Sequence, residues 1–212
     1  MKKNILPRPF IDETLIHPFR EMSDVLSLSC VISDALERDQ TMRYDMKPKA
    51  APKVIIGPAI TVKLTAGDIV DCLDVFEIAQ PGDVIVIDAF GLARNAGIVG
   101  AVIDGSCRDT DEAKLLGFPI TAKVSNPRAA HTATSGRKEP IEINVPITCG
   151  GVIVHPGDLI VADEIGVAVV PYDMLAKIYP IAREQANKEI DTRKEILNGA
   201  TVDELLKKFG RI

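Results

Sequence analysis

Two apolar stretches in the middle of the chain decide its fold: PGDVIVID at residues 81–88 and IVGAVIDGSCRDTDEAKLLG at residues 98–117. Each contains a run of apolar residues without polar alternation, which predicts a strand that is buried on both faces and has parallel neighbours. A Pro-Gly-Asp turn precedes the first strand. The second strand leads into a helix over 109–116, with Gly117 as its C-terminal cap. We therefore expect a sheet with helices connecting its strands.

The other expected elements follow from turn residues and periodicity. Helical spacing marks 23–38, with Ser29 as its N-terminal cap, then 68–79, a long amphipathic helix over 174–198 and a short helix over 202–209. Further strands are expected at 54–56, 59–64, 119–124, 141–147, 152–154, 159–162 and 167–170. Residues 1–20 are interpreted as an arm, and 41–52 as a loop. Many short strands with few helices predict a layered α/β fold with a mixed sheet.

One segment repeats the first stretch. PGDLIVAD at 156–163 resembles PGDVIVID at 81–88, because both are a turn that leads into a buried strand ending in Asp. Similar turn–strand units are common in β-rich domains, so we do not interpret the likeness as an internal duplication.

Composition excludes several classes of function. The net charge is −5, aromatic residues make up 4% and Trp is absent, which argues against binding to nucleic acid. The four cysteines are far apart and predict neither a zinc site nor a redox pair. No apolar run approaches the roughly 18 residues of a membrane span, and an apolar signal-peptide segment is missing after Met1-Lys2-Lys3. We expect a cytoplasmic protein, and the absence of a glycine-rich phosphate motif gives no support for nucleotide binding.

The densest polar cluster lies at residues 104–112, where an apolar strand opens into a helix. Strand ends of this kind are common ligand sites in α/β proteins. Arg108 offers a planar fork for a carboxylate, and Asp109 offers a hard oxygen ligand for Mg²⁺ or Mn²⁺. Together they suit a 2-oxo acid. The alternative is that Asp109 and its acidic neighbours complement the helix dipole while Arg108 pairs with them on a solvated surface.

From Ser27 to Pro171 the chain resembles the RraA-like family, which includes the 4-hydroxy-4-methyl-2-oxoglutarate aldolases. No single motif is decisive, but their order and number are specific. The matching stretches are SDAL at 33–36, GPAITV at 57–62, PGDV at 81–84, residues 97–109, NVPI at 144–147, CGG at 149–151 and HPGD at 155–158.

The resemblance implies a β/β/α fold like the phosphohistidine swivelling domain, assembled into trimers or hexamers. We expect a catalytic domain over 1–172 that includes the N-terminal arm, and a helical extension over 173–212 that packs on a neighbouring subunit. The extension and the arm also carry more apolar residues than one small domain readily covers, which independently favours a homo-oligomer.

For function, the resemblance implies a metal-dependent aldolase that releases pyruvate, with Asp109 as metal ligand and Arg108 as the pyruvate-binding residue. Oxaloacetate decarboxylation is expected as a side activity, because it passes through the same enolate. The alternative is a non-catalytic regulator that binds a ribonuclease. Regulator-type members tend to lack the Asp, so Asp109 favours the enzyme.

Other candidates carry less weight. The resemblance implies that a Glu of the long helix reaches a neighbouring subunit's site, and Glu189 fits the pattern better than Glu184. Asp88 ends a strand and is a weaker candidate for holding metal-bound water. His17, His131 and His155 are isolated and are interpreted as structural.

The connection over 89–97 is unexpectedly short. Parallel strands need a crossover of about a dozen residues or more, and the family carries a longer connection here. It includes a Gly-x-Leu turn whose N–H groups bind the substrate carboxylate, for which Gly91 and Leu92 are the candidates. Either the sequence lacks a segment that the protein carries, or the deletion is real. The first explanation, which we favour, predicts a break near Gly91–Ala93, with consecutive Cα atoms much farther apart than the about 3.8 Å of a trans peptide.

Overall fold

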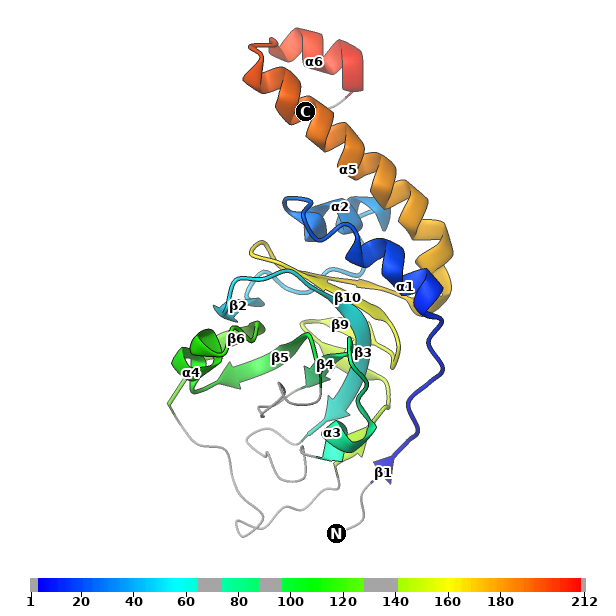
Figure 1. Cartoon of the computed structure of the whole chain (residues 1–212), viewed down its shortest axis with the longest axis vertical. Helices are drawn as coiled ribbons and strands as arrows, with labels where there is room; N and C mark the ends of the chain where they lie inside the picture. The colour runs from blue at the N-terminus through cyan, green and yellow to red at the C-terminus, as the bar shows by residue number, and fades with distance from the viewer. Residues whose placement is uncertain (1–3, 65–73, 88–96, 128–140, 211–212) are drawn as a thin grey trace.

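The computed structural model describes residues 4–64, 74–87, 97–127 and 141–210 (Figure 1). The helices are α1 (Glu13–Arg20), α2 (Leu28–Ala35), α3 (Val75–Ile78), α4 (Thr110–Leu115), α5 (Leu175–Leu197) and α6 (Val202–Phe209). The strands are β1 (Asn4–Ile5), β2 (Lys47–Ala50), β3 (Ile55–Lys63), β4 (Val84–Ile87), β5 (Gly100–Cys107), β6 (Ile120–Ser125), β7 (Glu142–Ile143), β8 (Ile147–Cys149), β9 (Val152–Val154), β10 (Leu159–Ala162) and β11 (Val167–Val170).

The main sheet is mixed and has the order β1-β7-β3-β4-β5-β6-β2. Its centre, β3-β4-β5-β6, is parallel, while β7 and β2 are antiparallel to their inner neighbours. The parallel pairing of β4 with β5 confirms the prediction from the two apolar stretches. The mixed α/β class is confirmed as well, and the likeness to a phosphohistidine swivelling domain stays a prediction.

Three apolar clusters define the layers. One lies between β10–β11 and the helices α1, α2 and α5. A second lies between the opposite face of β10–β11, the β8–β9 hairpin and one face of β3, β4 and β5. The third covers the other face of the main sheet, where α3 packs. Figure 1 shows the helices α1 and α2 above the strands, with α5 running away from them to α6 at its far end.

Strand β3 joins the layers because it changes partners along its length. Residues 55–58 pair with β10, residues 59–62 pair with β4 and residues 62–63 pair with β7. Pro58 has no N–H to donate and lies where the pairing passes from β10 to β4. The expectation of two segments, 54–56 and 59–64, was therefore wrong: Gly57-Pro58 marks a change of partner within one strand.

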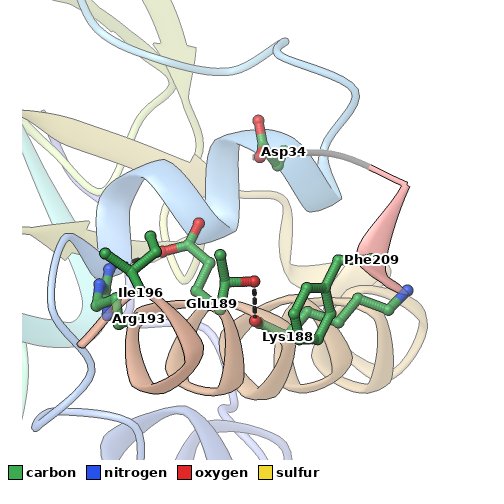
Figure 2. Close-up of a pocket in the computed structure, with 7 residues that line it drawn as sticks. Asp34, Lys188, Glu189, Arg193, Ile196 and Phe209 are labelled. Atoms are coloured by element: carbon green, nitrogen blue, oxygen red, sulfur yellow. Dashed lines mark hydrogen bonds and ion pairs between the residues drawn. The ribbon is translucent and has the colours of Figure 1, made fainter. Parts of the chain in front are cut away.

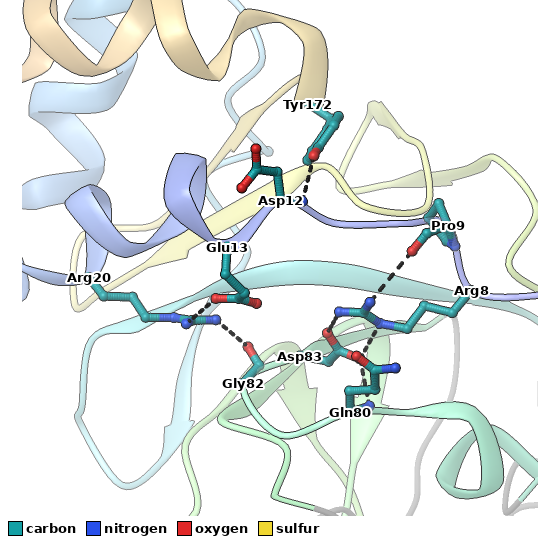
Figure 3. A network of polar contacts seen from close by, with 9 residues as sticks. All are labelled: Arg8, Pro9, Asp12, Glu13, Arg20, Gln80, Gly82, Asp83 and Tyr172. Atoms are coloured by element: carbon teal, nitrogen blue, oxygen red, sulfur yellow. Dashed lines mark hydrogen bonds and ion pairs between the residues drawn. The ribbon is translucent and has the colours of Figure 1, made fainter.

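The two Pro-Gly-Asp turns are built alike. Asp83 and Asp158 are both buried, and their carboxylates accept the backbone N–H groups of Gln80 and His155, three residues earlier, at 2.8 and 2.7 Å. Burial raises the pKa of Asp158. Asp83 also receives Arg8, whose Nε and Nη2 lie 2.9 and 2.6 Å from its two oxygens (Figure 3). This bidentate pair fastens the N-terminal arm to the turn before β4.

Several local expectations were wrong. Helix α2 begins at Leu28, and Ser29 lies inside it without acting as a cap. Instead its N–H and hydroxyl donate to the buried Asp163 carboxylate at 2.8 and 2.7 Å, so a distant carboxylate caps the helix. The loop expected at 41–52 contains the edge strand β2, because pairing with β6 outweighs its prolines and lysines. The arm at 1–20 contains α1 and β1.

The C-terminal helices agree with the expectation. Helices α5 and α6 occupy nearly the expected residues, and Thr201 and Glu204 form a capping box at the start of α6. All four fully buried residues of α5 lie in its first half, from Leu175 to Ala186, where the helix packs on α1 and α2 of its own chain. The domain boundary at 172/173 and the packing of 173–212 on a neighbouring subunit stay predictions. Of the helix expected at 68–79, residues 65–73 lie outside the described residues.

Candidate active site

The candidate site lies where β5 gives way to α4. Strand β5 runs between β4 and β6, and its register against β6 shifts between Ile103 and Ser106. A shift of this kind bends a strand and changes the direction of the side chains that follow. Two residues beyond the strand, Asp109 occupies the left-handed region at φ 54° and α4 begins at Thr110. The bend and the left-handed residue together place Arg108 and Asp109 just beyond the carboxyl end of β5, where the parallel strands of the sheet end.

Arg108 and Asp109 contact each other at this junction. Nε of Arg108 donates to Oδ2 of Asp109 at 2.9 Å, and the two side chains are 39% and 51% exposed. Asp109 stands at the N-cap position of α4, yet its carboxylate makes no capping hydrogen bond to the helix. A side-chain capping role therefore does not explain an Asp at position 109. The surface ion pair with Arg108, which the non-catalytic interpretation of this cluster expects, is present.

The chemistry of this pair fits a hard divalent cation that keeps most of its water. Among the described residues, the Asp109 carboxylate accepts the Arg108 hydrogen bond at Oδ2, which leaves Oδ1 available. Mg²⁺ commonly takes one or two protein carboxylates and completes its octahedron with water and substrate. Within the described ranges, His, Cys, Asp and Glu form no group of three that could hold a metal. A metal at Asp109 would therefore depend on few protein ligands from this part of the chain.

Asp104 joins three distant segments to β5 beside this junction. Its Oδ2 accepts the N–H of Gly150 at 2.9 Å, and its Oδ1 faces Lys123 Nζ and, at 3.4 Å, Arg43 Nη2. Its side chain is only 13% exposed. Asp104 belonged to the predicted polar cluster without an assigned role. Its position directly after the apolar residues 100–103 of β5 was the signal that could have singled it out.

Cys107 is the last residue of β5 and is buried. Its Sγ lies 3.7 Å from the Val124 carbonyl oxygen and 3.9 Å from Ser125 Oγ. Burial raises the pKa of this thiol. Since the thiolate is the reactive form, Cys107 is a packing residue at neutral pH.

Glu189 lies on α5, apart from Arg108 and Asp109 of the same chain. Arg193 Nη2 donates to Glu189 Oε2 at 2.8 Å, and both residues line a pocket between α2, α5 and α6 (Figure 2). Glu184 pairs with Lys188 on the exposed side of α5. Any role for either Glu at the site requires a second subunit, so the assignment of Glu189 stays a prediction.

Some of the remaining candidate site residues lie outside the described part of the chain, and the others lie within it. Gly91, Leu92, Asp88 and His131 lie outside the described residues, and so does the expected break near Gly91–Ala93. His17 and His155 contact Glu21 and Asp158 at 3.4 and 3.5 Å, which agrees with a structural interpretation. Across the described ranges, no helix combines the length and the apolar character needed to cross a membrane.

The fold and the site define a mixed α/β protein with an exposed Arg–Asp pair at a strand-to-helix junction. The family model of the RraA-like proteins, described as Aldolase/RraA, matches residues 29–169. This is two thirds of the chain, and the protein therefore belongs to the RraA-like family.

Curated relatives support this membership. A protein of Halalkalibacterium halodurans named "Putative 4-hydroxy-4-methyl-2-oxoglutarate aldolase" is 38% identical over 176 residues, covering 76% of this chain and 81% of the relative. An uncharacterized protein of Methanocaldococcus jannaschii, MJ0644, is 34% identical, covering 73% of this chain and 78% of the relative.

The alignment with the Halalkalibacterium halodurans protein is longer than the part of this chain that it covers. It spans 176 positions, whereas 76% of the 212 residues of this chain is about 161 residues. At least about 15 positions therefore hold residues of the relative without a counterpart here.

Solved structures share the fold. An uncharacterized protein from Pseudomonas syringae has a TM-score of 0.73 at 24% identity, covering 94% of this chain and 98% of the other. RraAS2 from Streptomyces coelicolor, described as an unusual member of the RNase ES inhibitor RraA protein family, has a TM-score of 0.68 at 25% identity, covering 88% and 100%. Names among the relatives thus point both to an aldolase and to a ribonuclease inhibitor.

Proposed function

We propose that this protein is a divalent-metal-dependent lyase. Its substrates are 4-hydroxy-4-methyl- or 4-carboxy-4-hydroxy-2-oxo acids, which it cleaves to pyruvate and a second oxo acid. The observation that carries the proposal is the pairing of Arg108 with Asp109 at 2.9 Å on the exposed end of β5, in a chain whose relatives bear an aldolase name.

The reaction breaks the C3–C4 bond of the substrate. The C4 hydroxyl loses its proton and becomes the oxo group of the second product, while the bond electrons form the enolate of pyruvate. Protonation of this enolate at C3 then gives pyruvate. The chemical difficulty lies in the negative charge that develops on the C2 oxygen.

Arg108 suits the stabilisation of that charge. Its guanidinium carries a permanent positive charge and is 39% exposed, so it can reach a ligand while keeping its bond to Asp109. A fixed cation placed where charge develops lowers the barrier more than one that only binds the ground state. We assign Arg108 to the enolate oxygen, and Gly91 and Leu92 to the substrate carboxylate.

Asp109 is the residue proposed to hold Mg²⁺ or Mn²⁺. When bound, the cation supplies Lewis-acid polarisation of the 2-oxo acid. Within the described part of the chain, the Asp109 carboxylate has an oxygen available for this purpose, and its bond to Arg108 keeps the proposed metal ligand and the cationic side chain adjacent. Oxaloacetate, which yields the same enolate on loss of carbon dioxide, is the expected alternative substrate.

The proposed assembly is a homotrimer or homohexamer in the cytoplasm, without nucleic-acid or membrane partners. In it, the extension 173–212 packs on a neighbouring subunit, and Glu189 serves as a catalytic residue of that subunit's site. The exposed second half of α5 supports this arrangement, because its apolar side chains Ile190, Ile196 and Leu197 remain uncovered.

A non-catalytic regulator of a ribonuclease is the second candidate. The short connection at 89–97 favours it, because a true deletion there would remove half of the substrate cradle. The RraA name of a fold neighbour supports the same alternative. Retention of Asp109 argues for the enzyme.

The two candidates are separated by a steady-state assay of pyruvate release. The purified protein is given a 4-hydroxy-4-methyl-2-oxo diacid or oxaloacetate, with Mg²⁺, with Mn²⁺ or with a chelator. We expect pyruvate only in the presence of the metal, at a rate above that of the metal alone. Equal rates with and without the protein would exclude the lyase and leave the regulator.

A further inference from the structure

Asp104 is a largely enclosed acid, with a side chain that is 13% exposed, and the proposed reaction does not use it. It stands four residues before Arg108, at the register shift of β5, and receives contacts from the segments of Arg43, Lys123 and Gly150. A carboxylate this enclosed is costly to bury unless each oxygen has partners. Both oxygens of Asp104 have them.

The contact with Gly150 fixes the tip of the β8–β9 hairpin. Gly150 has φ 57°, which suits glycine, and its N–H donates to Asp104 at 2.9 Å. Its carbonyl oxygen accepts the N–H of Arg43 at 2.8 Å, and the Met42 side chain fills the place of a Cβ. The hairpin tip and the 42–43 segment are thus held against β5 at the residue where that strand bends.

The positive charges of Lys123 and Arg43 offset the negative charge of the Asp104 carboxylate. Two cations face one carboxylate oxygen, so removal of the charge on Asp104 would leave both cations beside the junction that carries Arg108 and Asp109. Partners in the outer shell of a site hold its reactive groups in place, and their loss commonly lowers activity or metal affinity by roughly 10–100-fold.

We propose that Asp104 is a positioning residue. By tying the Gly150 hairpin tip, Lys123 and Arg43 to the bend of β5, it fixes the direction in which residues 105–109 leave the sheet, and hence the placement of Arg108 and Asp109. The inference rests on the proposed function for its kinetic part. Its structural part holds for either candidate function.

The test compares Asp104→Ala and Asp104→Asn with the control Asp45→Asn. Asp45 also faces Arg43, at 3.6 Å, but its side chain is 41% exposed, and its ion pair joins neighbouring residues of one segment. The first readout is hydrogen exchange by mass spectrometry on the full-length protein. We expect faster exchange in 105–110 and 148–152 for Asp104→Ala, a smaller increase for Asp104→Asn, whose amide oxygen still accepts from Gly150, and none for the control.

The second readout is a mutant cycle with Arg108→Lys, measured as kcat/KM for pyruvate release. Asp104→Ala alone should lower kcat/KM roughly 10–100-fold. Because Asp104 is proposed to act in part through Arg108, its loss should cost a smaller factor in the Arg108→Lys background than in the wild type, since coupled residues are not additive. A purely structural role would lower both backgrounds by the same factor and would overturn the proposal.

The two readouts, hydrogen exchange and kinetics, distinguish a failure of the lyase proposal from a failure of the positioning role of Asp104. If the wild type releases no pyruvate, the lyase proposal fails and the exchange arm alone decides the role of Asp104. Unchanged exchange in 105–110, or an increase spread evenly over the whole chain, overturns the positioning role. If Asp104→Ala does not fold, the same criteria apply to Asp104→Asn.

Discussion

At the scale of single residues, Arg108 and Asp109 are neighbours in sequence to which we assign different proposed tasks. The left-handed backbone of Asp109 turns the chain between them and lets the two side chains meet at 2.9 Å. A non-glycine residue in this region costs on the order of 1 kcal/mol or more, and Asp is among the residues that tolerate it best. Such local strain is common where backbone geometry serves a site.

We expect Asp109→Ala to abolish metal-dependent pyruvate formation while leaving the fold intact. The carboxylate is the proposed metal ligand, and it is half-exposed without a capping role, so its removal disturbs no packing. Pyruvate release and circular dichroism are measured on the same samples. Asp111→Ala, which removes another acid from the first turn of α4, is the matched control. Unchanged turnover in Asp109→Ala would refute the assignment.

Arg108→Lys should lower kcat/KM by roughly 10²–10³-fold, the usual cost of losing one donor to a developing oxyanion. Lysine keeps the charge but presents a single point, whereas the guanidinium can bond to Asp109 and to substrate at the same time. The measurement is steady-state kinetics with saturating Mn²⁺. A near-normal kcat/KM would show that Arg108 is not the substrate-binding residue.

At the scale of elements, the fold depends on close contacts between turns and strands. The backbone of β3 passes so near the turn before β4 that a Cβ at Gly57 would collide with the Gly82 carbonyl oxygen. Glycine at position 57 is therefore required by the approach of two backbones. The side chain of Ile55 similarly leaves no room for a Cβ at Gly100 in β5.

We predict that Gly57→Ala destabilises the protein by about 1–3 kcal/mol or more, the usual cost of overpacking. Urea unfolding followed by circular dichroism measures the change in the free energy of unfolding. Gly166→Ala is the control, because nothing lies within 4 Å of its added Cβ. Equal stability of the two variants would contradict the close approach of β3 to the turn.

The arm that precedes α1 is held by Arg8. We expect Arg8→Ala to cost about 3 kcal/mol, because it leaves the buried carboxylate of Asp83 without its charge partner. Arg20→Ala should cost less than about 1 kcal/mol, since Arg20 pairs with the exposed Glu13. The difference is read from urea unfolding of both variants. A loss of less than about 1 kcal/mol for Arg8→Ala would mean that the pair of Arg8 with Asp83 contributes little to stability.

At the scale of the whole molecule, the described surface leaves apolar side chains uncovered in several places, and two of these lie on helices. Leu115 and Leu116 lie at the end of α4, close in sequence to the candidate site. Leu197, Val202 and Leu206 lie on α5 and α6, which extend away from the strands (Figure 1). Exposed apolar groups on a projecting element are typical of surfaces that meet another chain.

We therefore predict a homo-oligomer of at least three subunits. Multi-angle light scattering at micromolar concentration should give at least three times the 22.9 kDa chain mass. Removal of residues 187–212 should lower the number of subunits in the assembly. Tyr44→Ser, at an exposed position outside both patches, should leave the number of subunits unchanged. A monomer mass for the unaltered protein would contradict the prediction.

The sequence by itself determined the class of fold, the parallel pair β4–β5, the long C-terminal helix and the Arg108–Asp109 pair. These features depend on local signals: uninterrupted apolar runs, turn residues, helical periodicity and the motifs of a family. The two Pro-Gly-Asp turns could be read directly because the same three residues form the same structure at both places.

Only the tertiary structure decided what depends on distant partners. Asp163 caps α2 from a remote loop, β3 passes unbroken through Gly57-Pro58, and β2 forms at a proline-containing edge. Asp104 likewise acquires its contacts from residues 43, 123 and 150. In each case the stabilising hydrogen bond or ion pair joins groups far apart along the chain. A local pattern contains no record of such partners, because only folding brings them within bonding distance.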